Sequence, residues 1–227
     1  MIKKQAIIFI AILVAVIVVL SFVIFSGLQA EQSAVPGVNV GDEFIYDIRC
    51  FWSSSDVDAK MPENFAQLNM TEWYKIVVTE VSGPEVLIEV TWRFTNGTEI
   101  KDMMGSVNVE TGIYSPTNGF WAIYGSNLRS NDRIRPLGPD RATVNETITS
   151  NYGAGGTRET NRVSLIQVRY DANDPTYSTT WTEYININFD RRTGMLVELL
   201  DMSVYNNPQQ RLTILWTLKE SNVWNIS

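Results

Sequence analysis

The 227 residues of this chain include no histidine and one cysteine, which leaves its plentiful carboxylates as the main candidates for catalysis. Without histidine no Ser–His or Cys–His pair can form, and the commonest metal ligand is absent. The glycine-rich stretch 153–156 continues into Thr157-Arg158 and therefore lacks the Gly-Lys-Ser/Thr of a phosphate-binding loop. A carboxylate-dependent hydrolase is the catalytic alternative, but acids such as Glu85 and Glu89 fall on the polar side of a strand pattern. The sequence thus predicts no catalytic residue, and it predicts no cofactor.

One short stretch has the spacing of a cation ligand set. Asp171, Asn173 and Asp174 place side-chain oxygens as at the start of a calcium loop. The glycine expected at the sixth position and the distant glutamate are missing, and Pro175 follows at once. Because Asp and Asn before Pro are also ordinary turn residues, we interpret the stretch as a turn and predict no metal site.

The single cysteine, Cys50, excludes any disulfide within the chain. It alternates with Tyr46, Ile48 and Trp52, so we expect it on the apolar side of a strand as a small buried hydrophobe. The alternative is an intermolecular disulfide, which requires an exposed thiol.

An uncharged apolar run at residues 6–28 decides where the rest of the chain lies. As a helix, 23 residues span ~34 Å, which is enough to cross a hydrocarbon core of ~30 Å. Lys3 and Lys4 precede the run and the next charge is Glu31, so the positive-inside rule places the N-terminus in the cytoplasm. We therefore expect a single-pass protein of the cell membrane with residues 31–227 outside the cell.

The expected organisation follows from this anchor. A cleaved signal peptide is the alternative, but its apolar stretch has 7–15 residues, and Leu28-Gln29-Ala30 is only half of a small-x-small cleavage site. The sequence thus predicts four parts: a cytoplasmic stub (1–5), a transmembrane helix (6–28), a tether (29–39) and an extracellular β-domain (40–227).

The exported part is acidic. Beyond residue 30 lie 16 of the 18 Lys and Arg residues and all 25 Asp and Glu residues, a net charge of −9. That balance opposes binding to nucleic acid, because no basic patch can cover phosphates.

Four Asn-x-Ser/Thr triplets fit the acceptor pattern for N-glycosylation, and an exported domain would be in the right compartment for that modification. The candidate acceptors are Asn69, Asn96, Asn145 and Asn225. Asn96-Gly97 also suits a tight hairpin turn, where a glycan would not disturb strand pairing.

Period-two alternation of apolar and polar residues predicts a succession of strands separated by Gly, Pro and Asn turns. A short helix is expected at 62–68, with Pro62 in its first turn. Trp52, Trp92, Trp181 and Trp216 fall on the apolar side of their strands, and we expect them, Trp92 above all, to be buried in the core. The strands are expected at 42–52, 71–81, 85–94, 98–109, 143–152, 157–170, 178–189, 194–205 and 210–219.

This pattern predicts an all-β, mainly antiparallel ectodomain with a strongly curved sheet, either a half-barrel or a sandwich, after one N-terminal transmembrane helix. The stretch 115–142 is rich in Gly and Pro and has little periodicity, so we expect a long loop. Phe120, Trp121 and Tyr124 lie in this loop and are our candidates for exposed contacts with a ligand or partner.

Two segments resemble each other. The run 107–113 (Val-Asn-Val-Glu-Thr-Gly-Ile) is echoed in 187–195, which ends in Thr193-Gly194-Met195. Two duplicated halves would explain the echo, and so would independent use of the same turn residues.

Four features occur together in this chain: Lys3-Lys4 before an anchor, the run 40–47 (Val-Gly-Asp-Glu-Phe-Ile-Tyr-Asp), Asn-x-Thr triplets, and the run 189–198 (Phe-Asp-Arg-Arg-Thr-Gly-Met-Leu-Val-Glu). In this combination the chain resembles a group of uncharacterised archaeal membrane-anchored surface proteins with a β-rich ectodomain. The resemblance covers nearly the whole chain and rests on strand and turn residues. The aromatic strands and the Thr-Gly hairpin are also similar to lipoprotein-carrier (LolA-type) half-barrels, which implies a sheet face able to hold acyl chains and transfers no ligand residues.

From these observations we expect a membrane-anchored extracellular module for binding, interaction or envelope structure, with an extracellular protein, glycan or lipid as partner. The alternative is a half-barrel that binds a hydrophobic ligand such as lipid. A filled, covered core would favour the first, and an open apolar face would favour the second.

Overall fold

The computed structural model of the protein describes residues 33–115, 122–139, 141–151, 156–170, 180–206 and 209–226. The chain divides into two compact units, Met1–Gln32 and Ser33–Ser227, and the described residues belong to the second. The predicted transmembrane helix 6–28 and the calcium-like stretch 171–174 lie outside them. Within the described ranges no helix has the length and apolar character needed to cross a membrane.

The described residues form an all-β unit, as the alternation predicted. The short helix also forms, beginning directly after Pro62. In chain order the elements are β1 (Glu43–Ser54), α2 (Glu63–Leu68), β2 (Thr71–Ser82), β3 (Glu85–Phe94), β4 (Glu99–Asn108), β5 (Tyr114–Ser115), β6 (Glu146–Asn151), β7 (Thr157–Tyr170), β8 (Thr180–Asp190), β9 (Leu196–Asn206) and β10 (Gln209–Ser221).

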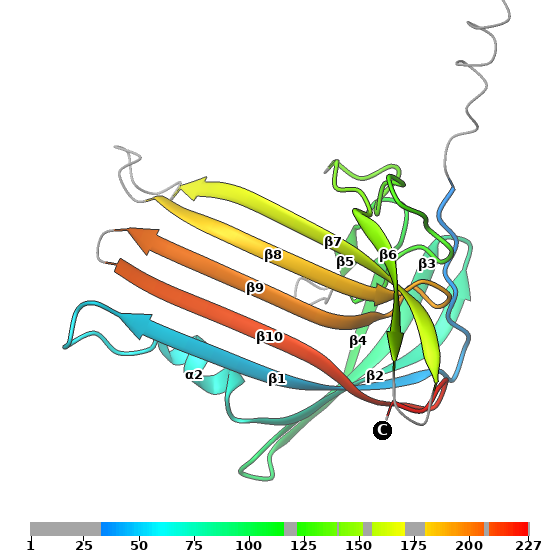
Figure 1. Ribbon diagram of the computed structural model, residues 1–227. Helices are drawn as coiled ribbons and strands as arrows, with labels where there is room; N and C mark the ends of the chain where they lie inside the picture. The colour runs from blue at the N-terminus through cyan, green and yellow to red at the C-terminus, as the bar shows by residue number, and fades with distance from the viewer. Residues whose placement is uncertain are drawn as a thin grey trace, which may run out of the picture. The chain divides into compact units, whose positions relative to one another are not determined.

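All ten strands belong to one antiparallel sheet, in the order β5-β4-β3-β2-β1-β10-β9-β8-β7-β6. Strands β1–β5 form one meander and β6–β10 form another, and the two meet where β1 pairs with β10 (Figure 1). This central pairing runs from Phe44↔Ser221 to Ser54↔Gln210. The first and last strands of the described domain are therefore neighbours at the middle of the sheet.

One face of the sheet, which we call the inner face, carries the core. On β1 it presents Phe44, Tyr46, Ile48 and Cys50, all buried, while the alternate residues are half-buried or exposed. The β1 phase is as predicted. Cys50 is buried as a free thiol, which confirms the expectation of a small buried hydrophobe.

The segment between β5 and β6 crosses the domain from one edge of the sheet to the other. Its described part, 122–139 with 141–145, has two isolated bridges and no strand, so the prediction of a long loop is confirmed. Seven of its side chains are buried in the core, namely Ala122, Ile123, Tyr124, Leu128, Ile134, Ala142 and Val144. We call it the crossover segment.

Two Thr-Gly turns hold the crossover segment in place at the same end of the sheet. In the turn after β8, Tyr124 N–H donates to Gly194 C=O (2.9 Å) and Leu196 N–H donates to Ala122 C=O (2.7 Å). Gly194 has φ +76°, and a Cβ there would lie 2.1 Å from the Tyr124 carbonyl oxygen, so only glycine fits. In the turn after β4, Gly112 has φ +75°, and a Cβ there would lie 3.2 Å from the side chain of Arg135.

These two turns are the segments that resemble each other in sequence. In each turn, a side-chain oxygen of the first residue accepts hydrogen bonds from backbone N–H groups of the turn. The Asn108 side chain accepts from Glu110 and Thr111, and the Asp190 side chain accepts from Thr193. One turn follows the fourth strand of its meander, and the other follows the third strand of its own. The positions are not equivalent, so the shared turn geometry explains the echo better than a duplication.

Candidate functional site

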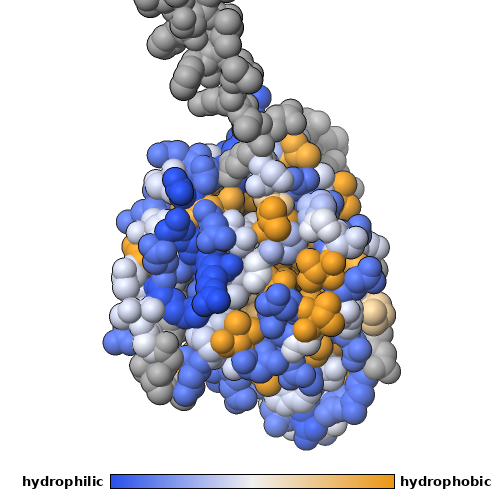
Figure 2. All heavy atoms as spheres, turned by 90° about the vertical axis from the view of Figure 1, so that its right-hand side faces the viewer, coloured by the Kyte–Doolittle hydropathy of each residue, from blue (hydrophilic) through white to orange (hydrophobic). Residues whose placement is uncertain are grey.

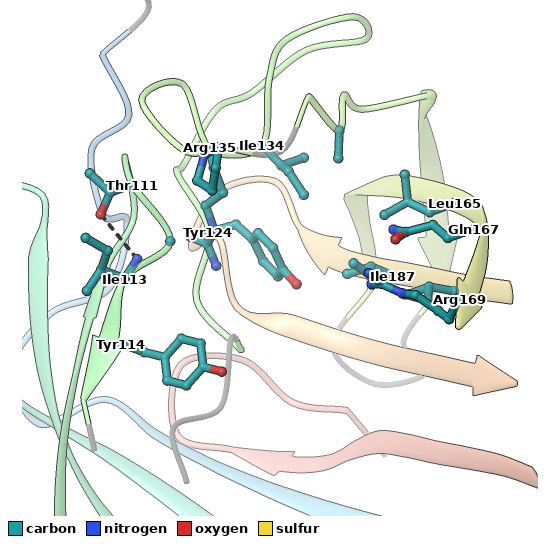
Figure 3. Close-up of a pocket in the computed structure, with 14 residues that line it drawn as sticks. Thr111, Ile113, Tyr114, Tyr124, Ile134, Arg135, Leu165, Gln167, Arg169 and Ile187 are labelled. Carbon is teal, nitrogen blue, oxygen red and sulfur yellow. Dashed lines mark hydrogen bonds between the residues drawn. The ribbon is translucent and has the colours of Figure 1, made fainter. Parts of the chain in front are cut away.

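A pocket of about 450 Å³ lies between the inner face and the crossover segment (Figure 3). Its walls are the turn before β5, the crossover segment, and the inner side of β7 and β8. Most of the lining side chains are apolar, and the polar ones include Arg135 and Arg169. The lining residues are Thr111, Gly112, Ile113, Tyr114, Tyr124, Ile134, Arg135, Pro139, Ala142, Leu165, Gln167, Arg169, Ile185 and Ile187.

Arg135 is a buried cation in the wall of this pocket, 4% exposed. Its Nη1 donates to the carbonyl oxygens of Ile123 (2.7 Å) and Val109 (3.4 Å), and its guanidinium lies 4.4 Å above the ring of Tyr124. A buried guanidinium needs acceptors for its donors, and here backbone carbonyls accept from Nη1 while an aromatic face lies against the charged group. Arg135 therefore joins the crossover segment to the β4–β5 turn and forms part of the wall.

The inner face is covered at one end and open at the other. At the end that the crossover segment covers, Phe44, Val86, Val163 and Phe189 have 0% exposure. At the opposite end the inner-facing side chains are only half-buried. We call these side chains the aromatic end of the inner face: Trp52, Trp92, Phe94, Trp181 and Tyr205.

The half-burial of these tryptophans corrects the expectation of a tryptophan core. Trp92 lies on the predicted face and packs against the core, but it is not among the most buried residues. Its Nε1–H donates to Thr71 Oγ1 (2.9 Å), and its ring stacks on Phe94 at 4.8 Å. Trp181 stacks on Tyr205 at 5.4 Å. Alternation set the side of the sheet correctly, but no described segment covers this end as the crossover segment covers the other.

The carboxylate of Asp201 lies on the inner face between two isoleucines. It lies directly opposite Ile185 of β8 and Ile214 of β10. Its Oδ1 is out of contact with solvent and accepts no hydrogen bond within the described part of the chain. Burial first, and then the charge of Glu183, raises the pKa of Asp201 from 3.8 to about 6, against a smaller opposite effect of Arg169.

The charged neighbours of Asp201 are already paired with each other. Arg169 Nε lies 2.9 Å from Glu183 Oε2, and this ion pair sits on the inner side of β7 and β8. Burial, Glu183 and Asp201 together raise the pKa of Tyr205 on the same strand. Asp201 therefore has no ion-pair partner of its own among the described residues, although Arg169 and Glu183 share its side of the sheet.

The predicted contact residues fare unequally. Tyr124 is 2% exposed and stacks on Phe189 at 4.6 Å, so the expectation that it makes exposed contacts is wrong. It is buried because the crossover segment packs into the core, although its ring does border the pocket (Figure 3). Phe120 and Trp121 lie outside the described residues.

All four candidate asparagines for glycosylation are exposed, but their side chains differ in the hydrogen bonds that they make. Asn69 accepts a hydrogen bond from Cys50 N–H (2.7 Å) and donates one to Cys50 C=O (2.8 Å). Asn96 and Asn145 each accept one, from Thr98 N–H and Ser164 N–H. The amide of Asn69 is thus tied to β1 at both ends, and Asn96 remains the best-placed acceptor.

Sequence reasoning missed Asp201, the pocket and Arg135. The signal for Asp201 was available: it stands two residues after Leu199 and two before Ser203, on the side of β9 that faces inward. The pocket left no such signal, because its walls come from segments distant in the sequence. Among the described residues no group of three or more acids or cysteines is placed to hold a metal ion.

Comparison with known proteins gives no relative from which to transfer a function: the chain matches no protein-family model, no curated protein and no solved structure.

Proposed function

We propose that the β-domain is an exported, membrane-anchored module that binds a hydrophobic ligand against the inner face of its sheet. The observation that carries this proposal is the apolar pocket of about 450 Å³, which is within the ~300–1,000 Å³ common for small-molecule sites. In this proposal the sheet is the curved wall of a half-barrel, and the crossover segment closes one end. Of the two functions expected from the sequence, we therefore favour binding of a hydrophobic ligand over a purely structural role.

The aromatic end supports the same conclusion. The large apolar side chains at this end lie on one face and are only half-buried, and soluble domains seldom leave such surface accessible without a use for it. Tryptophan and tyrosine offer wide, rigid contact surfaces with a polar edge, as an amphipathic ligand requires. A ligand lying along the inner face would complete the burial that the protein's own residues leave incomplete.

We propose further that residues 6–28 anchor the domain in the cell membrane, with the N-terminus cytoplasmic and the domain on the outside, as in the archaeal surface proteins that the sequence resembles. Intact mass of the protein purified from membranes tests the anchor. A mature chain beginning near Glu31 would contradict it.

Binding can be tested by fluorescence, because all seven tryptophans follow residue 32 and none lies in the anchor. A bromine-labelled chain such as 11-bromoundecanol quenches tryptophans that it contacts, so quenching reports on the β-domain. We expect the full chain in neutral lipid nanodiscs to be quenched saturably, at probe concentrations where Leu165→Asp is not. Leu165 is a half-buried inner-face residue that lines the pocket.

The matched control is Ile166→Asp, one residue along the same strand. Ile166 is 72% exposed on the other side of β7 and does not line this pocket, so this variant should be quenched like the parent chain. Equal loss of quenching in both variants, or none in the parent, would refute the proposal.

A second function, a protein-interaction module, has one observation in its favour. Ile166, Val168 and Tyr170 are 58–72% exposed on the outer side of β7. Strand β6 pairs with β7 only over Thr157–Arg162, so within the described residues the rest of β7 is an edge of the sheet. Figure 2 shows the face on the right-hand side of Figure 1, where apolar residues also interrupt a mostly polar surface; the exposed β7 residues are identified from their exposure and not from this view. If Ile166→Asp abolishes a protein contact in cross-linking and leaves probe binding intact, both functions hold.

A further inference from the structure

Asp201 is placed where a ligand of the inner face would meet it. Its cross-strand neighbour Ile185 is part of the pocket wall, and its neighbour on the other side, Ile214, packs against the core. Asp201 therefore stands one strand beyond the pocket, on the continuous surface that leads from the pocket toward the aromatic end.

Among the residues that the structure describes, none supplies a hydrogen-bond partner for the buried Oδ1 atom of this half-buried side chain. Oδ1 is also shielded from water. Arg169, a cation on this part of the inner face, is held by Glu183 at 2.9 Å. A buried acceptor without a donor is costly, and a charged one more so, unless a bound group supplies the missing partner. The group that fits carries one positive charge and hydrogen-bond donors.

The aromatic residues around Asp201 suit a cation as well. Trp216 lies diagonally across β10 from Asp201 and meets Tyr74 edge to face at 5.1 Å. Farther along β9, toward the aromatic end, lie the stacked rings of Tyr205 and its β8 neighbour Trp181. Aromatic faces attract ammonium groups, whereas they gain nothing comparable from a carboxylate or phosphate.

We propose that the ligand is a cationic amphiphile whose protonated amine binds the Asp201 carboxylate while its apolar body lies against Ile185 and the pocket. This inference rests on the proposed function and adds the chemical class of the ligand. An anionic lipid or fatty acid would place a second negative charge beside Asp201, so the geometry opposes it.

The test compares three probes of equal chain length that differ only in the head group: 11-bromoundecylamine, 11-bromoundecanol and 11-bromoundecanoate. Each is titrated into the full chain in neutral lipid nanodiscs, with tryptophan quenching as the readout and empty discs used to fix the free probe concentration. We expect the amine to bind about tenfold more tightly than the alcohol or better, as a charge-assisted hydrogen bond in a partly dry site provides. The carboxylate should bind least tightly.

The decisive variant is Asp201→Asn, which keeps the shape of the side chain and removes its charge. It should lose the preference for the amine and bind the alcohol as the parent does. Slow labelling of the buried Cys50 thiol shows that the variant is folded. In the parent chain the preference should also shrink at pH 5 relative to pH 8, because protonation removes the Asp201 charge while the alkylamine stays protonated. The other titratable groups facing Asp201 are Glu183 and Arg169, Tyr205 on β9 and Cys50 on β1.

The outcomes separate the two proposals. Equal affinity for amine and alcohol in the parent, or a preference that survives in Asp201→Asn, overturns the cationic ligand and leaves hydrophobic binding standing. Absence of saturable quenching by all three probes overturns both. Should Asp201→Asn fail to fold, the pH series on the parent chain decides alone, and a preference unchanged between pH 5 and pH 8 refutes the inference.

Discussion

An acid on an apolar face should make the domain less stable as the pH rises, and Asp201 allows that effect to be measured. The folded state holds the Asp201 proton more tightly than the unfolded state, because its pKa rises from 3.8 to about 6 on folding. Stability must therefore fall between about pH 4 and pH 6, where the folded state binds more protons, and stay low above that range. In Asp201→Asn this contribution is absent.

The structure gives the size of the effect. The difference between 3.8 and about 6 corresponds to about 3 kcal/mol. Since Asp201 is only partly buried, solvent screening reduces this to about 1–2 kcal/mol. The parent chain should thus lose about 1–2 kcal/mol of unfolding free energy relative to Asp201→Asn between pH 4 and pH 7.

Urea unfolding of both chains, followed by tryptophan fluorescence at each pH, measures the difference. The matched control is Glu99→Gln, for which the sign is opposite. Hydrogen bonds from Lys101 and then Arg93 lower the pKa of Glu99, so the parent should lose stability relative to this variant as the pH falls below about 4.5. A parent–variant difference for Asp201→Asn that does not change with pH would refute the placement of Asp201 in a dry, apolar setting.

Three further predictions concern stability and access. Asp190→Ala should destabilise the domain by about 3–5 kcal/mol in urea unfolding, because the fully buried carboxylate accepts two hydrogen bonds from Arg158 (2.6 and 3.0 Å). The control Asp47→Ala breaks an exposed ion pair and should cost less than about 1 kcal/mol. Gly194→Ala should lower the melting temperature and cost more than about 1 kcal/mol, since an added Cβ would overlap a carbonyl oxygen of the crossover segment, and an unchanged melting temperature would show that this contact is not made. Burial raises the pKa of Cys50, so its thiol should react with a maleimide only as fast as the domain unfolds, and rapid labelling of the folded chain would contradict its burial.

Period-two alternation predicted the strands well because it depends on local burial alone. Each predicted strand has a counterpart with bounds within a few residues, and the inner face of β1 is as expected. Partners are a different matter. Alternation shows which side of β1 is apolar, but nothing in residues 43–54 indicates that β1 pairs with β10 and not only with β2.

The candidate site was predicted less well, and for a related reason. Whether Trp92 is fully buried depends on whether another segment lies over it, and alternation within its own strand carries no information on that. The same holds for Tyr124, which looked like an exposed loop residue and is buried because two Thr-Gly turns fasten its segment to the sheet. Burial that arises from distant segments leaves no local pattern.

The pairing of β1 with β10 has a consequence for how the domain is made. Phe44 and Ser221 are 177 positions apart in the chain, so the centre of the sheet cannot close until both meanders have been synthesised. Until β10 is made, the edges of β1 and β9 that pair with it are open, and open strand edges attract other chains. Non-local pairing of this kind also slows folding. A chain that pauses before residue 209 would therefore present two half-sheets, each with an open edge where β10 will later pair, which makes completion of the last strand the step that protects the protein from aggregation.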